Sequence, residues 1–65
     1  MKKLSPMEDT ILNLYADGDS TKQIAAELEI SARTVEAHKV HFMAKLGANH
    51  ICHAVAIYAR AGLLK

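Results

Sequence analysis

The chain has 65 residues, a mass of 7.1 kDa and a net charge of +1, and 51% of its residues are hydrophobic. A chain this short forms one small domain and leaves little volume for the enclosed ligand cavity of an enzyme. Its single cysteine excludes an intrachain disulfide. The longest apolar run, residues 54–59, is far shorter than the roughly 20 residues that cross a bilayer. We therefore expect a cytoplasmic, non-membrane domain that is not an enzyme.

The charges are distributed unevenly along the chain. Residues 1–30 carry three Lys and six Asp or Glu, which gives 3 − 6 = −3. Residues 31–65 carry five Lys or Arg and one Glu, which gives 5 − 1 = +4, and they also hold all four His. The C-terminal half is therefore the part of the chain that could face phosphate groups.

Capping signals predict two helices in the first half of the chain. Ser5 is a typical N-cap, Pro6 suits the first helical position, and Glu8 completes a capping box. Gly18 supplies the C-terminal stop. The apolar residues between these signals recur at helical spacing, and we expect them to face the core: Met7, Ile11, Leu12, Leu14 and Tyr15. A second capping box, Ser20 to Gln23, opens a helix of two turns whose apolar face is Ile24, Ala25 and Leu28.

The third predicted helix begins after Ser31 and ends at Gly47. At about 100° per residue, its core-facing side chains are Val35, Phe42 and Leu46, with His38, Lys39 and Met43 on the flanks. Met43, like Met7, is expected to fill the core. The outer face carries Arg33, Ala37, Val40 and Ala44, and all of these except Arg33 have small side chains. Glu36 and His41 border this face. A fourth helix is predicted from Asn49 or His50 to Ala61, with Gly62 as its stop.

The second and third predicted helices form a helix-turn-helix unit at about residues 21–40. The major groove of DNA is about 12 Å wide and admits one helix, and small outer side chains let that helix approach the base edges. The first helix of such a unit crosses the phosphates, where its N-terminal N–H groups are free to bind. The arrangement therefore suits DNA binding.

Several short segments together resemble a known family. They are Leu4-Ser5-Pro6-Met7-Glu8, Lys22-Gln23-Ile24-Ala25, Ile30-Ser31, Thr34-Val35 and Lys45-Leu46-Gly47. The combined pattern is similar to the LuxR-type helix-turn-helix domain, which is found in quorum-sensing regulators and in response regulators of the NarL/FixJ group. The resemblance runs from Leu4 to Leu64 and does not decide between these two branches. It implies an all-α, four-helix domain over residues 4–65, preceded by an N-terminal tail of residues 1–3.

The resemblance also implies a function, namely sequence-specific binding to double-stranded DNA by the output domain of a bacterial transcriptional regulator. The third helix would enter the major groove, and the chain would bind as a homodimer through the fourth helix. The residues at the base-contacting positions are Glu36, Ala37 and Val40. Those at phosphate-contacting positions are Thr21, Lys22, Arg33, Thr34, His38, Lys39 and Lys45, and those at the dimer contact are Val55, Ala56 and Ala59. No cofactor or metal is expected, and a regulatory domain N-terminal to this chain is an expected partner.

The sequence leaves alternatives open. The base-facing positions lack Arg and Lys, although a basic side chain on guanine is the commonest specific contact. A protein-interaction module that keeps the fold and has lost DNA binding is therefore the alternative function, and a promoter module like those of sigma factors ranks below it. Glu36 could also be a solvated helix residue, and Lys45 suits the negative end of its helix as well as it suits a phosphate.

The histidines and the cysteine raise two further hypotheses. His38 and His41, like His50 and His53, are three residues apart and could in principle bind zinc. A structural zinc site in so small a domain normally uses at least two cysteines, so we prefer a packing or phosphate role for His38. Cys52 lies near a helix N-terminus, which lowers the pKa of a thiol, but a packed cysteine is favoured over a redox sensor.

Overall fold

The computed structural model describes residues 3–65, and within that range the chain forms four helices and no strand. The helices are α1 (Pro6–Ala16), α2 (Thr21–Leu28), α3 (Ala32–Leu46) and α4 (Ile51–Arg60). The predicted all-α fold class is confirmed, and each helix lies where the capping signals place it. Residues 1 and 2 of the predicted tail lie outside the described residues. No helix between residues 3 and 65 is long and apolar enough to cross a membrane.

Serine side chains cap the first three helices. The Ser5 hydroxyl accepts a hydrogen bond from the Glu8 N–H at 3.2 Å, and Glu8 Oε1 accepts one from the Ser5 N–H at 2.8 Å. Ser20 and Gln23 exchange the same pair of bonds at the start of α2. Each capping box satisfies N–H groups that have no partner within the helix, which fixes where the helix begins.

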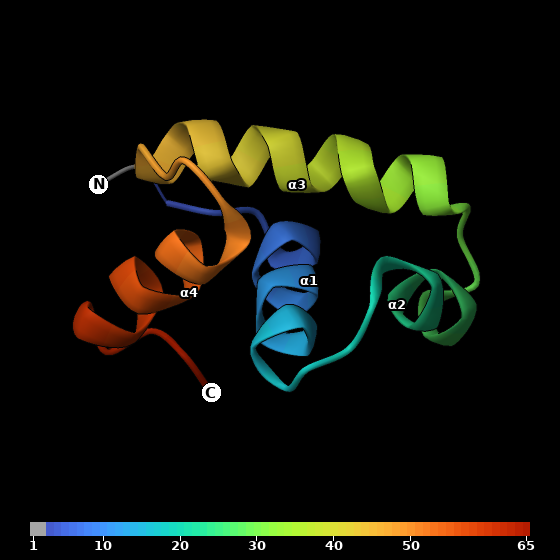
Figure 1. Cartoon of the computed structure of the whole chain (residues 1–65), viewed down its shortest axis with the longest axis horizontal. Coiled ribbons are helices and arrows are strands. Elements are labelled where there is room, and N and C mark those ends of the chain that lie inside the picture. The colour runs from blue at the N-terminus through green and yellow to red at the C-terminus, as the bar shows by residue number, and fades with distance from the viewer. Residues whose placement is uncertain (1–2) are drawn as a thin grey trace.

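The other three helices pack around α3, the longest of the four. In Figure 1, α3 runs along the long axis of the molecule, α1 lies beneath its middle, and α2 and α4 flank α1. Helix α3 packs against each of the other three helices, whereas α2 and α4 do not contact each other. The short α2 and the first turns of α3 therefore form one end of the molecule, away from α4.

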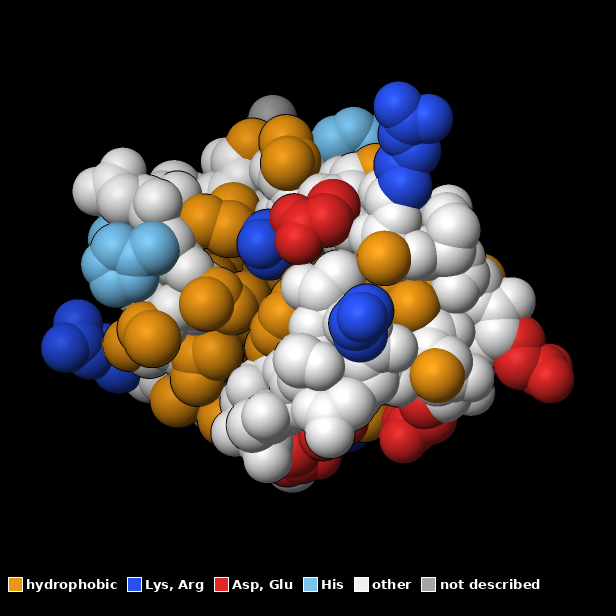
Figure 2. Space-filling model, turned by 45° about the vertical axis from the view of Figure 1, so that its right-hand side comes forward, with side chains coloured by type: hydrophobic (Ala, Val, Ile, Leu, Met, Phe, Trp, Pro, Cys, Tyr) orange, Lys and Arg blue, Asp and Glu red, His pale blue; other side chains and the backbone are white. Residues whose placement is uncertain are grey.

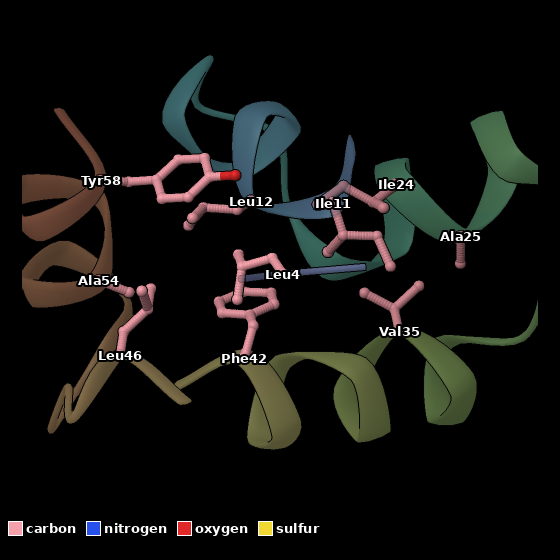
Figure 3. Close-up of a cluster of buried hydrophobic side chains, with 10 residues drawn as sticks. All are labelled: Leu4, Ile11, Leu12, Ile24, Ala25, Val35, Phe42, Leu46, Ala54 and Tyr58. Atoms are coloured by element: carbon pink, nitrogen blue, oxygen red, sulfur yellow. The ribbon is translucent and has the colours of Figure 1, made fainter. Parts of the chain in front are cut away.

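A single core joins the helices. Figure 3 shows the ten buried hydrophobic side chains pointing toward one another, with Phe42 of α3 extending toward Leu4. Val35 and Phe42 are fully buried and Leu46 is buried, as the helical spacing of α3 predicts. Met43 packs against this core, but Met7 is 39% exposed, so its predicted core position is wrong.

The exposure of Met7 has a structural cause. The buried face of α1 contains Glu8, Ile11 and Leu12, which places Met7 at its edge. Leu4, which precedes the helix, is itself buried and contributes to the core. A charged residue thus occupies the inner side of the first turn, where the sequence pattern predicted a methionine.

The turn between α2 and α3 contains the one non-glycine residue in the described range with a left-handed backbone. Glu29 ends α2 with φ 57° and ψ 42°, and its N–H bonds to the Ala26 carbonyl at 3.3 Å. Glycine adopts this conformation without the steric cost that a Cβ atom brings. The tight turn between the two helices therefore stores a small backbone strain at Glu29.

Candidate nucleic-acid interface

The outer face of α3 is open to solvent. The three predicted base-contacting residues, Glu36, Ala37 and Val40, are all exposed, and Val40 is 62% exposed. Arg33 and Ala44 lie on the same face and are also exposed. The structure therefore brings the predicted reading residues together on one accessible surface, most of which is formed by small or uncharged side chains.

The carboxylate of Glu36 is held by two neighbours. Its Oε1 accepts a hydrogen bond from the Thr21 hydroxyl at 3.2 Å, and its Oε2 lies 2.9 Å from Lys39 Nζ. The hydrogen bond from Lys39, and to a smaller extent its charge and the Thr21 hydroxyl, hold the pKa of Glu36 below its ordinary value, although burial opposes this. Glu36 is therefore an ionised acceptor whose position is fixed from both α2 and α3.

Tyr15 joins this group from α1. Its hydroxyl lies 2.6 Å from Thr21 Oγ1, and the Lys39 ammonium lies 5.8 Å from the centre of its ring. The latter distance permits a cation–π interaction. The helical spacing of the sequence places Tyr15 only in the apolar face of the first helix, because such spacing carries no information about a hydroxyl on another helix.

The predicted phosphate-contacting residues fall into two groups. Lys22, Arg33 and Thr34 are exposed in the first turns of α2 and α3. The others are partly buried and lie closer to the core: Thr21, His38, Lys39 and Lys45. Lys22 and Arg33 can reach a ligand without rearrangement, whereas four of the predicted residues already have side-chain partners within the domain, namely Thr21, Thr34, Lys39 and Lys45.

Lys45 has an acidic partner that sequence analysis did not identify. Its Nζ lies 2.6 Å from Glu8 Oε1, and Glu8 is only 4% exposed. Glu8 also caps α1 through Ser5, so the same carboxylate stabilises the start of α1 and anchors the end of α3. The two residues are far apart in the sequence, and no local spacing rule links them. The predicted phosphate contact of Lys45 thus competes with this ion pair.

The surface charge is diffuse. Figure 2 shows one face of the molecule, on which Lys and Arg side chains lie apart from one another and one of them lies against an acidic side chain. This agrees with the net charge of only +1. Affinity for a polyanion would therefore depend on a few well-placed contacts rather than on a broad basic patch.

The predicted dimer residues lie on α4, at the other end of the molecule from α2. Val55 and Ala56 are partly buried, and Ala59 is exposed. Val55 also lines a shallow groove of about 360 Å³ between the end of α1 and the start of α4, together with Tyr15, Ala16, Gly18, Asp19, Ile51 and Cys52. The groove shares Tyr15 with the group of side chains around Glu36.

The histidines of α4 act as local hydrogen-bond acceptors. His50 Nδ1 accepts the His53 N–H at 3.3 Å and so caps the helix, and His53 Nδ1 accepts the Asn49 N–H at 3.2 Å. Cys52 is exposed rather than packed, contrary to the preferred interpretation of the sequence. Over residues 3–65 no three or more His, Cys, Asp or Glu side chains are grouped so that they could hold a metal ion.

Comparison with known proteins identifies relatives of nearly the whole chain. The family model described as bacterial regulatory proteins of the luxR family matches residues 2–58. The oxygen regulatory protein NreC of Staphylococcus aureus is 54% identical over 46 residues, which are 71% of this chain and 21% of that protein.

Two solved structures are similar to the present fold. The response regulator ChrA of a heme-sensing two-component system matches with a TM-score of 0.91 and 36% identity, over 98% of this chain and 32% of ChrA. VqmA of Vibrio cholera, solved in a complex with a ligand and DNA, matches with a TM-score of 0.89 and 27% identity, over 97% of this chain and 28% of VqmA. The chain therefore spans between a fifth and a third of the length of these relatives.

Proposed function

Because the chain belongs to the LuxR family of bacterial regulatory proteins, we propose that it is the sequence-specific DNA-binding domain of a transcriptional regulator. The chain belongs to a family of transcriptional regulators and is not an enzyme. The observation that carries the proposal is the exposed outer face of α3, which α2 supports from one side and which presents Ala37 and Val40 to solvent.

The dimensions and side chains of α3 suit the major groove. An α-helix with its side chains is about 10–12 Å across, and the groove is about 12 Å wide. Ala37 and Val40 can touch thymine methyl groups, and the Glu36 carboxylate can accept a hydrogen bond from a cytosine amino group. Each good base contact discriminates by about 1–3 kcal/mol, so these residues support moderate sequence preference.

Phosphate contacts would orient α3 in the groove. The exposed Lys22 and Arg33 are the first candidates, because each lies in the first turn of its helix, where free N–H groups also favour an anion. The remaining proposed phosphate contacts are Thr21, through its N–H at the first position of α2, and the side chains of Thr34, His38, Lys39 and Lys45. Such contacts carry no base information, but they fix the register of the protein on the duplex.

We further propose that the domain binds as a homodimer through Val55, Ala56 and Ala59 of α4. Two copies of a weakly charged domain gain affinity when they are joined, because binding of the second copy becomes intramolecular. The relatives are three to five times longer than the matched region, which supports a further domain with a regulatory role in the whole protein. We place that domain N-terminal to this chain and the whole regulator in the cytoplasm. Ala59→Glu should lower the affinity for a duplex with two half-sites much more than the affinity for a duplex with one half-site.

Selection from random duplex DNA tests the proposal. The wild-type chain should recover a two-fold symmetric motif, and its affinity should fall as salt rises because phosphate binding releases counterions. Lys22→Ala and Arg33→Ala should weaken binding to all sequences and reduce the salt dependence. The proposal would be contradicted if the selection recovered no motif, or if the chain bound all duplexes equally.

One observation favours a second candidate function, a protein-interaction module on the same fold. The outer face of α3 lacks Lys and Arg at its base-facing positions, and Val40 is exposed there. A module of this kind would bind its protein partner equally well after Lys22→Ala and Arg33→Ala. It would lose that partner after Val40→Glu, which places a charge on the apolar part of the face.

A further inference from the structure

Four side chains from three helices form a closed ring at the base of the outer face of α3. Tyr15 of α1 contacts Thr21 of α2, Thr21 contacts Glu36 of α3, Glu36 pairs with Lys39, and Lys39 lies over the Tyr15 ring. Tyr15, Thr21 and Lys39 are partly buried, whereas the Glu36 side chain is 48% exposed. The ring therefore presents one member, Glu36, to solvent.

The protons of the ring have a fixed order. An ionised carboxylate can only accept hydrogen bonds, so Thr21 donates its single hydroxyl proton to Glu36 Oε1. The bond between Tyr15 and Thr21 must then run from the Tyr15 hydroxyl to Thr21 Oγ1, which is 2.6 Å away. Tyr15 thereby fixes the direction in which Thr21 donates, and it acts on Glu36 without touching it.

The ring leaves part of the Glu36 carboxylate available. A carboxylate offers about four acceptor positions, and Thr21 and Lys39 use one on each oxygen. The remaining positions belong to a side chain that is half exposed on the same face as Ala37 and Val40. An amino group on a base edge can donate to these positions while the two internal bonds stay in place.

We propose that Tyr15 and Thr21 are positioning residues for base recognition, which hold the Glu36 carboxylate as a preorganised acceptor for the amino group of cytosine. This inference rests on the proposed function, since it requires that α3 faces the base edges. Ordering a flexible side chain before binding removes a cost that would otherwise be incurred on the duplex. Base preference at one position of the site then depends on a tyrosine that never touches DNA.

The test compares base preferences of variants of the full 65-residue chain. Selection with the wild type and with Glu36→Ala identifies the position that Glu36 reads, because the preference at that position disappears in the variant. Dissociation constants are then measured on the selected duplex and on duplexes with each other base pair at that position. Tyr15→Phe keeps the aromatic group and removes the hydroxyl. It should reduce the preference for cytosine by about threefold to tenfold, which corresponds to the cost of ordering one side chain.

Further variants separate positioning from general stability. Tyr15→Phe should leave the affinity for mismatched duplexes and the salt dependence unchanged, and it should have no effect on base preference in the Glu36→Ala background. Tyr58→Phe is the matched control, since it removes the same hydroxyl from a tyrosine bonded to Asp9 and should not change base preference. Thr21→Val removes the hydroxyl that bonds to both Tyr15 and Glu36, and it should reduce the preference at the same position.

Three results would overturn the inference. A Tyr15→Phe variant and a Thr21→Val variant that both keep the full preference for cytosine would show that the ring does not position Glu36. A loss of affinity that is equal for all duplexes would assign Tyr15 a structural role only. A Glu36→Ala variant that recovers the wild-type motif would exclude Glu36 as a reader. Failure of the wild type to recover any motif would instead refute the proposed function itself.

Discussion

Replacement of Lys45 by methionine should destabilise the domain by about 2 kcal/mol. Methionine keeps much of the apolar stem of lysine but removes the ammonium group that lies 2.6 Å from Glu8 Oε1. Glu8 is 4% exposed, so its carboxylate would lose its cationic partner while remaining largely out of water. The change therefore tests whether Lys45 fixes the end of α3 to α1.

The magnitude follows from the burial of the two partners. Removing one member of a fully buried ion pair costs about 3–5 kcal/mol, and an exposed pair contributes about 0–1 kcal/mol. The Lys45 side chain is 33% exposed and Glu8 keeps its bond from the Ser5 N–H, so an intermediate value applies. At roughly 0.05–0.15 kcal/mol per residue, the whole domain has about 3–10 kcal/mol of stability, and the loss would be a large part of it.

Urea unfolding followed by circular dichroism at neutral pH measures this loss. Lys65→Met is the matched control, because Lys65 is 78% exposed and Asp9 keeps its bond from Tyr58, so the loss of this ion pair should cost less than about 1 kcal/mol. Equal costs for the two variants would refute the reasoning, and so would a loss of DNA binding by Lys45→Met without a loss of stability.

The pH dependence gives a second check on the same ion pair. Burial favours the neutral form of Glu8, but the bonds from Lys45 and Ser5 outweigh it and hold the pKa of Glu8 below its ordinary value of 4.5. A carboxyl whose pKa is lower in the folded state stabilises the fold above its unfolded pKa, and that stability is lost as pH falls through the folded pKa. The cost of Lys45→Met should therefore shrink below pH 4.5. A cost that stays constant with pH would contradict the assignment.

Three further predictions concern the core, the turn and the α1–α4 contact. Phe42→Ala should cost about 3–5 kcal/mol, because the ring is fully buried, and should leave the chain largely unfolded by circular dichroism. Glu29→Gly should raise the free energy of unfolding by up to about 1 kcal/mol by relieving the left-handed backbone, whereas Glu27→Gly, within α2, should lower it. Burial and the bond to Asp9 raise the pKa of Tyr58 to about 12, so stability should fall as pH rises from 10 toward that value. Ultraviolet titration of the wild type and of Tyr58→Phe checks this, and a Tyr58 phenol that ionises near pH 10 would contradict it.

Local sequence signals were sufficient to predict most of the fold. Ser5, Ser20 and Ser31 all cap helices in the structure because a capping residue acts on N–H groups within its own first turn. Helical spacing also predicted the buried and exposed faces of α3, since both follow from the same 3.6-residue period. Met7 was misplaced because spacing alone does not show where the apolar stripe of α1 begins.

Contacts between distant residues were not predictable in the same way. The ion pair of Glu8 with Lys45 and the bond of Tyr58 to Asp9 join residues that are 37 and 49 positions apart. Each partner has an adequate local explanation, so nothing in the sequence required a second role. Glu8 belongs to a capping box and Tyr58 is a buried helix residue, while Asp9 and Lys45 suit the dipoles at the ends of their helices. For the same reason the candidate site could be predicted as the face containing Glu36, but the ring that holds Glu36 could not.

The central claim is that the exposed face of α3 reads the base edges of duplex DNA. The most direct test is a nuclear magnetic resonance titration of the isotope-labelled chain with the selected duplex. If the face of α3 reads the duplex, amide signals should shift most at the start of α2 and along residues 33–41, with the signals of Glu36 and Val40 among the largest changes. Shifts confined to α4, or a pattern that is the same for a scrambled duplex, would contradict this claim.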